Sequence, residues 1–252
     1  MSDPGSRRVV LPLTLFVALL VVWEAAVPLF RIQQIVLPAP SGIARTMIDT
    51  AGPIAFHARH TLVTTLVGFG LAVGLGLLLG FAIGGSATLH DALYPLLVGF
   101  NSIPKAAMVP LLVMWFGIGA VPAVLTAFLL AFFPVAVNVA VGLATLESEL
   151  RDVLRVLGAS RWQIFRKVGV PRTMPLFFAS LKVAISSAFV GSVISETVAS
   201  NAGIGYLMAV AGSDFNTRLA FGGLFVLAAL GVLLYGVFAA IERRLTGWAY
   251  TE

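Results

Sequence analysis

The sequence has little charge and no cysteine. Only 11% of its 252 residues are Asp, Glu, Lys or Arg, whereas a soluble domain has about 25%. Hydrophobic residues make up 59% of the chain, and the mean hydropathy is +1.01. A soluble fold of this size could not bury so much apolar surface, so the composition predicts an all-α, polytopic membrane protein. The lack of cysteine excludes a disulfide scaffold and a thiolate metal site.

Several kinds of functional motif are also missing. No Gly-x-x-x-x-Gly-Lys-Ser/Thr phosphate-binding loop and no nucleophile–base arrangement occurs, so the chain is expected neither to hold ATP nor to be an enzyme. His57 and His60 have no evident third ligand, and no metal site is expected. Glu24 and Glu196 are the only acids within the apolar segments described below. An ion-gradient-driven secondary transporter would need more carboxylates and inverted repeats, and it is kept as the alternative to the function inferred below. A membrane scaffold without a transport role is a third hypothesis.

Six apolar segments are long enough to cross a bilayer, which takes roughly 20 residues. These segments are residues 9–30, 61–88, 92–117, 122–144, 174–196 and 219–241. The third is expected to be one helix with a kink at Pro104 and Lys105. A secretory signal peptide is the competing interpretation of the first segment, and it is disfavoured because the segment is long and Glu24-Ala25-Ala26 is a poor cleavage site. A short helix in the outer interface, capped by Ser41, is expected after the Pro38–Pro40 break.

The basic residues are distributed unevenly about these spans. Ten of the 16 Lys and Arg residues fall on the side of the two termini, and four fall on the opposite side. This excess predicts that both termini and the loop at residues 146–172 are cytoplasmic. Because the basic residues follow the topology and do not gather on one soluble face, the net charge of +5 does not indicate a nucleic-acid partner.

The loop at residues 146–172 is predicted to contain two amphipathic helices. Apolar residues recur at helical spacing from Leu146 to Leu157, and Gly158 is expected to end or bend that helix. Residues 160–163 fit a capping box that starts a second helix, which Pro171 is expected to stop before the fifth span. The pair is predicted to be a platform for a cytoplasmic partner. Packing beneath its own bundle is an equally good interpretation of the periodicity.

The same loop resembles that of the inner-membrane permeases of ATP-binding-cassette (ABC) importers. Their pattern is Glu-Ala-Ala, three residues, Gly, nine residues and Ile-x-Leu-Pro. Here Asp152 replaces the Glu, Gly158 and Pro171 match, and Val168 and Val170 replace Ile and Leu. Further segments are similar to the nitrate/sulfonate/taurine-type subfamily: Leu37–Pro40, Ile103–Lys105 with Pro110-Leu111, Trp115–Gly119, Phe133-Pro134 with Asn138, and Glu196 with Gly203–Leu207.

This resemblance implies a binding-protein-dependent, type I permease of a bacterial inner membrane, with a cytoplasmic coupling helix. The chain itself would hold no cofactor, since ATP and Mg would belong to two cytoplasmic ABC ATPase subunits. A second permease copy would complete a homodimer, and a periplasmic binding protein would deliver a small solute, expected to be anionic. The residues expected to dock on the ATPase are Asp152, Arg155, Gly158, Ala159, Ser160, Arg161, Trp162 and Phe165.

A second set of residues is expected to line the translocation pathway: Asn101, Lys105, Met108, Asn138, Ser186, Ser192 and Glu196. Lys105 would favour an anionic solute, or it would bond carbonyls freed at the kink. Interhelical hydrogen bonding is the alternative for the polar members. Glu196 is expected to pair with Arg218 or to mark the periplasmic gate, and Lys182 to reach lipid headgroups or the docking loop. The glycines of residues 68–84 are expected to pack helices closely.

Overall fold

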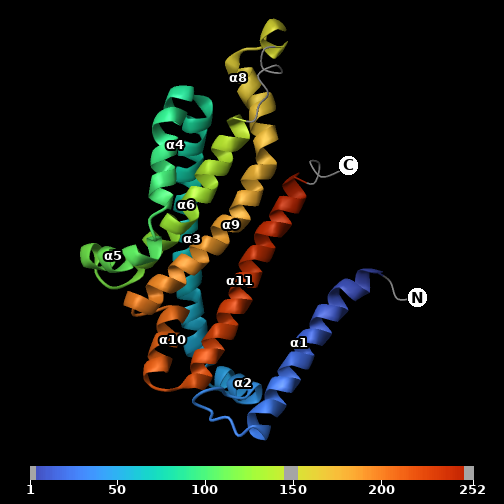
Figure 1. The fold of residues 1–252 in the computed structure, drawn as a ribbon, viewed down its shortest axis with the longest axis vertical. Helices are drawn as coiled ribbons and strands as arrows, with labels where there is room; N and C mark the ends of the chain where they lie inside the picture. The colour runs from blue at the N-terminus through green and yellow to red at the C-terminus, as the bar shows by residue number, and fades with distance from the viewer. Residues whose placement is uncertain (1–3, 145–152, 247–252) are drawn as a thin grey trace.

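The computed structural model describes residues 4–144 and 153–246, which form helices and turns and contain no strand (Figure 1). The helices are α1 (Pro4–Leu29), α2 (Pro40–Asp49), α3 (Ala51–Gly85), α4 (Ala87–Asn101), the 3₁₀ turn η1 (Lys105–Met108), α5 (Val109–Phe116), α6 (Ala120–Ala144), α8 (Arg161–Ile164), the π-helical turn η2 (Phe165–Gly169), α9 (Val170–Ala199), α10 (Ile204–Ser213) and α11 (Thr217–Thr246). Five helical segments of this described part are long and apolar enough to cross a membrane, or six if the bent pair of α4 with η1–α5 is one span. The all-α membrane fold is therefore confirmed.

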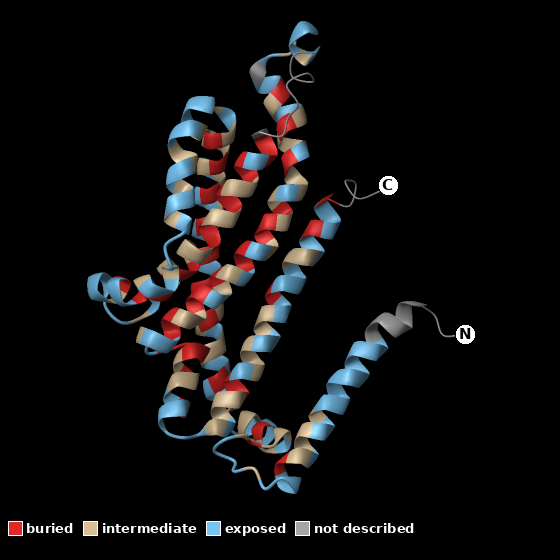
Figure 2. Ribbon diagram, viewed as in Figure 1, coloured by how far each residue is buried: buried red, intermediate tan, exposed pale blue. Residues whose placement is uncertain are grey.

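The centre of the bundle is formed by α3, α6 and α9, which lie side by side and carry most of the buried residues (Figures 1 and 2). Glycines of α3 allow α6 to approach closely, because a Cβ at Gly76 would lie 2.9 Å from Val135 Cβ and one at Gly80 would lie 2.6 Å from Val139 Cβ. Gly68 and Gly84 contact α6 in the same way. The expected packing role is confirmed for these four glycines. Nothing lies near Gly70 or Gly74.

The helix α3 begins at Ala51, ten residues before the predicted span. The polar residues between His57 and His60 ended the apolar run in the sequence, but they do not interrupt a helix. The short helix α2 is present as expected, although Ser41 does not cap it. The Ser41 N–H and Oγ instead donate to the Glu24 carboxylate of α1, at 2.9 and 2.6 Å. One of the orphan N–H donors at the start of α2 is thus satisfied by a neighbouring helix.

The third predicted span is broken and not merely kinked. The helix α4 ends at Asn101, and η1 with α5 leaves at 79° to it. Pro104 explains the break, because a proline disfavours helical backbone in the residue before it and cannot continue the α4 hydrogen-bond ladder. Ser86 caps the other end of α4 by accepting a hydrogen bond from the Leu89 N–H at 3.4 Å. Lys105 therefore lies at a corner and not within a continuous helix.

The second prediction that fails concerns Pro171, which does not stop the helix before the fifth span. Helical backbone runs from Arg161 through η2 into α9 and ends at Ala199. Pro171 occupies the first turn of α9, where the register has just changed from π to α, and proline is tolerated in a first turn because its missing N–H is not needed there. The turn α8 is consequently continuous with the fifth span.

The helix α1 stands apart from this bundle (Figure 1). Its contacts lie at the end near α2, where Trp23 packs on Phe221 and Phe225 of α11 with ring centroids 5.9 and 6.1 Å apart. Residues 10–19 of α1 are exposed (Figure 2). Such an apolar surface suits a lipid environment.

Candidate functional site

Residues 153–164 project from one end of the bundle, opposite α2 and α10 (Figure 1). Residues 153–156 are helical, and Gly158 follows with φ of +84°. The Gly158 N–H donates to Arg155 O, and the Ala159 N–H donates to Leu154 O, both at 2.9 Å. This pair of bonds is the Schellman motif, in which a glycine in the left-handed region ends a helix. The prediction that Gly158 ends the first helix is confirmed.

The capping box at the start of the second helix is confirmed too. The Ser160 N–H donates to Gln163 Oε1 at 2.8 Å, and the Gln163 N–H donates to Ser160 Oγ at 3.2 Å. Only Ala159 separates this box from Gly158, so the two helical turns meet at a defined corner. We call residues 153–165 the docking element.

The docking element exposes apolar side chains beyond the bundle. Val156 is 88% exposed, Leu157 76% and Trp162 65%. Arg155 and Ser160 are also exposed, whereas Ile164 is buried. Asp152 and the preceding residues of the predicted first helix lie outside the described residues. An exposed apolar patch at the end of a membrane protein, beside polar residues, is typical of a protein–protein contact.

Phe165 differs from its neighbours because it faces the bundle. Its ring stacks on that of Trp162 at 5.5 Å and meets the ring of Phe81 in α3 edge-on at 5.8 Å. Phe165 and Phe81 both pack against the main hydrophobic core. Within the docking element, Phe165 therefore connects the exposed Trp162 to the membrane helices.

The expected pathway residues do not converge on one place. Lys105 Nζ donates to Asn101 O at 2.7 Å and to Asn101 Oδ1 at 2.5 Å, at the corner where α4 ends. Met108 closes η1 beside them. Asn138 Nδ2 donates to Pro134 O of its own helix, and Ser186 Oγ donates to Lys182 O. Ser186 also lines a pocket of about 310 Å³ between α9 and α11.

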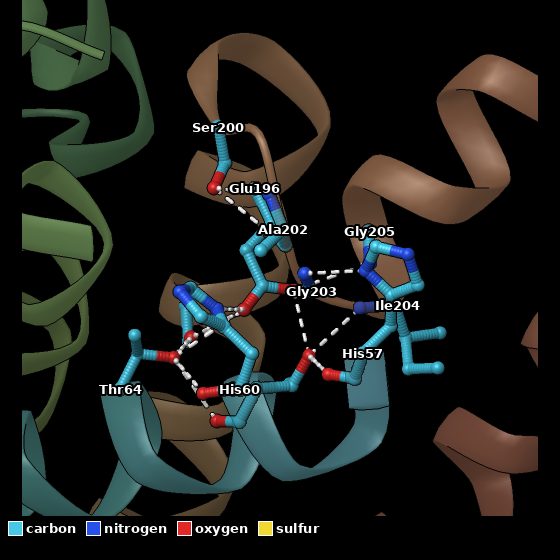
Figure 3. A network of polar contacts seen from close by, with 11 residues as sticks. His57, His60, Thr64, Glu196, Ser200, Ala202, Gly203, Ile204 and Gly205 are labelled. Atoms are coloured by element: carbon cyan, nitrogen blue, oxygen red, sulfur yellow. Dashed lines mark hydrogen bonds and ion pairs between the residues drawn. The ribbon is translucent and has the colours of Figure 1, made fainter. Parts of the chain in front are cut away.

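Ser192 and Glu196 belong to a buried polar network at the other end of the bundle (Figure 3). Glu196 is 1% exposed. Its carboxylate accepts hydrogen bonds from Thr61 Oγ1 at 2.8 Å, Thr64 Oγ1 at 3.3 Å and Ser192 Oγ at 3.4 Å. His60 Nδ1 lies 3.6 Å from the Glu196 Oε1 atom. A buried carboxylate requires such partners, because burying it unpaired would cost several kcal/mol.

The same network caps the N-terminus of α10 (Figure 3). The Ile204 N–H donates to Thr61 Oγ1 at 2.9 Å and the Gly205 N–H to Glu196 Oε2 at 3.1 Å. The Gly203 N–H donates to His57 Nδ1 at 3.0 Å. Three donors at the N-terminus of one helix are thus satisfied by side chains of α3 and α9.

The glycines of the segment Gly203-Ile204-Gly205 are required by this contact. Gly203 has φ of +105°, and a Cβ there would overlap the Glu196 carboxylate. A Cβ on Gly205 would lie 2.6 Å from Val193 O. The Glu196 and glycine segments that were similar to the permease subfamily therefore form one structural unit.

The expected pairing of Glu196 with Arg218 is wrong, because Arg218 Nη2 donates to Gln34 Oε1. Lys182 pairs with Glu242 of α11, Nζ to Oε2 at 2.5 Å, a partner that was not expected. Glu242 was not singled out from the sequence. Apart from its lying directly after the apolar segment 219–241, no signal in the sequence indicated that it would face Lys182.

The comparisons with known proteins agree with this architecture. Residues 72–247 match the family model described as "Binding-protein-dependent transport system inner membrane component". The chain is 35% identical to the riboflavin transport system permease protein RibX of Chloroflexus aurantiacus, over 94% of this chain and 89% of RibX. It is 32% identical to the formylaminopyrimidine transport permease protein ThiX of Halalkalibacterium halodurans, over 94% of this chain and 95% of ThiX. It is 30% identical to the taurine transport system permease protein TauC of Escherichia coli, over 97% of this chain and 92% of TauC.

A solved structure also shares the fold. A chain of the MetNI methionine ABC transporter, in an inward-facing conformation, superposes with a TM-score of 0.64 and 22% sequence identity. The match covers 75% of this chain and 94% of that one. The chain therefore belongs to the family of binding-protein-dependent inner-membrane transport components, and it is a transmembrane permease subunit of an ABC importer.

Proposed function

We propose that the docking element seats in a cytoplasmic ATPase subunit and couples ATP hydrolysis to transport. The observation that carries this proposal is the Gly158 corner, which holds two short helices together at the end of the bundle and exposes Val156, Leu157 and Trp162. An apolar surface of this kind would be costly in water and is stabilised when a partner covers it. The family description, which names a binding protein, supports delivery of solute from the other side of the membrane.

The remaining parts of the assembly are proposed from the similarity to ABC importer permeases. Two copies of the chain form the pathway as a homodimer, and two ATPase subunits bearing ATP and Mg lie beneath them. The docking element and both described chain ends face the bacterial cytoplasm, while α2 and α10 face the periplasmic binding protein. The excess of Lys and Arg on the side of the termini supports this orientation. The chain itself performs no catalytic step.

The experiment that tests this function is joint purification and reconstitution. The tagged permease, expressed with its partner ATPase and binding protein, is expected to retain the ATPase when it is purified in detergent. In proteoliposomes the complex should accumulate the solute of that binding protein only when ATP is supplied. Uptake that continues without ATP, or that collapses with the proton gradient, would contradict the proposal and favour an ion-driven carrier.

We further propose that the solute is anionic and that Lys105 contributes to its passage. Lys105 is the one Lys or Arg at the corner between α4 and α5, and it is half-buried there. The substrates named for the relatives differ in whether they carry an anionic group: taurine and aliphatic sulfonates carry a sulfonate group, and riboflavin does not. A cation at a break in a membrane helix is where an anion would be stabilised.

Lys105→Ala is expected to reduce uptake of an anionic solute such as an aliphatic sulfonate about tenfold, since a hydrogen bond to a charged group contributes about 1.5–3 kcal/mol. Assembly with the ATPase should be unchanged. Lys105→Arg keeps the charge and is the matched control, expected to retain most of the uptake. The measurement is initial rate of ATP-driven uptake against solute concentration. Equal rates in all three proteins would mean that Lys105 serves only to bond the Asn101 carbonyl.

A further inference from the structure

The docking element has two connections to the membrane helices, and they differ in kind. The covalent connection passes through η2, where the Val170 N–H donates to Phe165 O five residues back. This π-helical turn breaks the regular α ladder between the docking element and α9. Such turns are frequent at functional sites and mark places where a helix changes register. The helical path to α9 is continuous, but it contains a change of register at η2.

The second connection is formed by three aromatic rings, which we call the aromatic bridge: Trp162, Phe165 and Phe81. Trp162 stacks on Phe165 with an interplanar angle of 24°, and Phe165 meets Phe81 at 74°. Stacked and edge-to-face pairs at these distances are the favoured arrangements of aromatic rings. Trp162 is largely exposed, whereas Phe165 and Phe81 are partly buried against the core. The bridge thus runs from the exposed surface of the docking element to the side of α3.

The far end of the bridge rests on a rigid part of the bundle. Phe81 lies between Gly80 and Gly84, the two glycines through which α3 packs directly on Val139 and Leu143 of α6. The other end of α3 carries Thr61 and Thr64, which bond Glu196 and the start of α10. A displacement applied to Phe81 would therefore act on α3 and α6 together, along a helix of 35 residues.

We propose that Phe81 is a positioning residue for transport. Through Phe165 it fixes the orientation of the docking element on α3, so that movement of Trp162 by the ATPase is transmitted to α3 and α6 as well as to α9. The inference rests on the proposed docking function. It adds that coupling depends on a side chain outside the loop, one that the ATPase would not touch.

The test compares Phe81→Ala with the wild type in the complete reconstituted complex of permease, ATPase and binding protein. The ATPase is expected to remain bound and to hydrolyse ATP, while solute taken up per ATP hydrolysed falls about tenfold, a typical size for loss of coupling between sites. Phe81→Tyr keeps the ring and is expected to restore the wild-type ratio. Phe81→Leu keeps apolar volume without the ring, and it should lower the ratio as well. It provides the test if Phe81→Ala folds poorly.

Phe238→Ala is the matched control, because Phe238 forms a ring pair with Phe69 of α3 at 4.9 Å, away from the docking element. It is expected to lower the unfolding temperature without changing uptake per ATP. An unchanged ratio in Phe81→Ala and Phe81→Leu, or an equal fall in Phe238→Ala, would overturn the inference. Loss of the ATPase from Phe81→Ala would overturn it too. A Trp162→Ala complex that keeps its ATPase and full uptake would contradict the docking function itself.

Discussion

Gly158→Val is expected to release the ATPase from the permease while the chain still inserts in the membrane. The glycine has φ of +84°, a conformation that a β-branched residue adopts only at a cost of about 1–3 kcal/mol. A Cβ at this position meets nothing within 4 Å, so crowding does not contribute. The expected effect therefore comes from the backbone alone. It should disturb the Schellman bonds from Gly158 and Ala159 and misalign the two helical turns.

The measurement is the ratio of ATPase to permease after purification by a tag on the permease, together with ATP-driven uptake. We expect both to fall by about tenfold or more, as a loss of about 1.4 kcal/mol or more in binding implies. Gly158→Asn is the matched control, because asparagine tolerates the left-handed region and often ends helices. It should keep most of the association. Normal assembly and uptake in Gly158→Val would contradict the role given to the corner.

Glu196→Leu is expected to destabilise the permease more than any other single change considered. The substitution would leave the Gly205 N–H without its buried acceptor, and the hydroxyls of Thr61 and Ser192 would keep only His57 O and Thr64 Oγ1 as acceptors. An unsatisfied buried N–H costs about 1–3 kcal/mol, and each lost hydrogen bond to a charged acceptor costs about 1.5–3 kcal/mol, so a loss of about 3 kcal/mol or more is expected. The N-terminus of α10 would lose one of its caps and its attachment to α9.

Two measurements separate this effect from a general loss of folding. The unfolding temperature of the purified permease should fall, and amide exchange should accelerate most at the start of α10, where the Ile204 and Gly205 N–H groups are bonded. Glu196→Gln keeps one acceptor oxygen and should lose less stability. Thr197→Ala is a control on the neighbouring exposed position and should be nearly neutral. Wild-type exchange in α10 of Glu196→Leu would contradict the capping role.

The docking element could be predicted from the sequence because its bonds are local. The Gly158 corner joins residues at most five apart, and the capping box joins residues three apart. Interactions at these separations follow from residue type and spacing. The prediction that Pro171 stops the helix before the fifth span was wrong. A proline in the interior of a helix usually ends that helix, but the change of register at η2 places Pro171 in the first turn of α9. The spacing of residues in the sequence did not reveal this change of register.

The sequence by itself determined that the chain is a helical membrane protein, which residues could form its spans, and how its loop turns. Composition and periodicity suffice for these features, since each depends on a solvent preference or on nearby bonds. Only the tertiary structure decided which polar groups meet. Thr61 and Glu196 are 135 residues apart, and Glu242 faces Lys182 from another helix. Such pairs depend on how α3, α9, α10 and α11 pack, and the spacing of residues along one helix carries no information about the rotation of its neighbours.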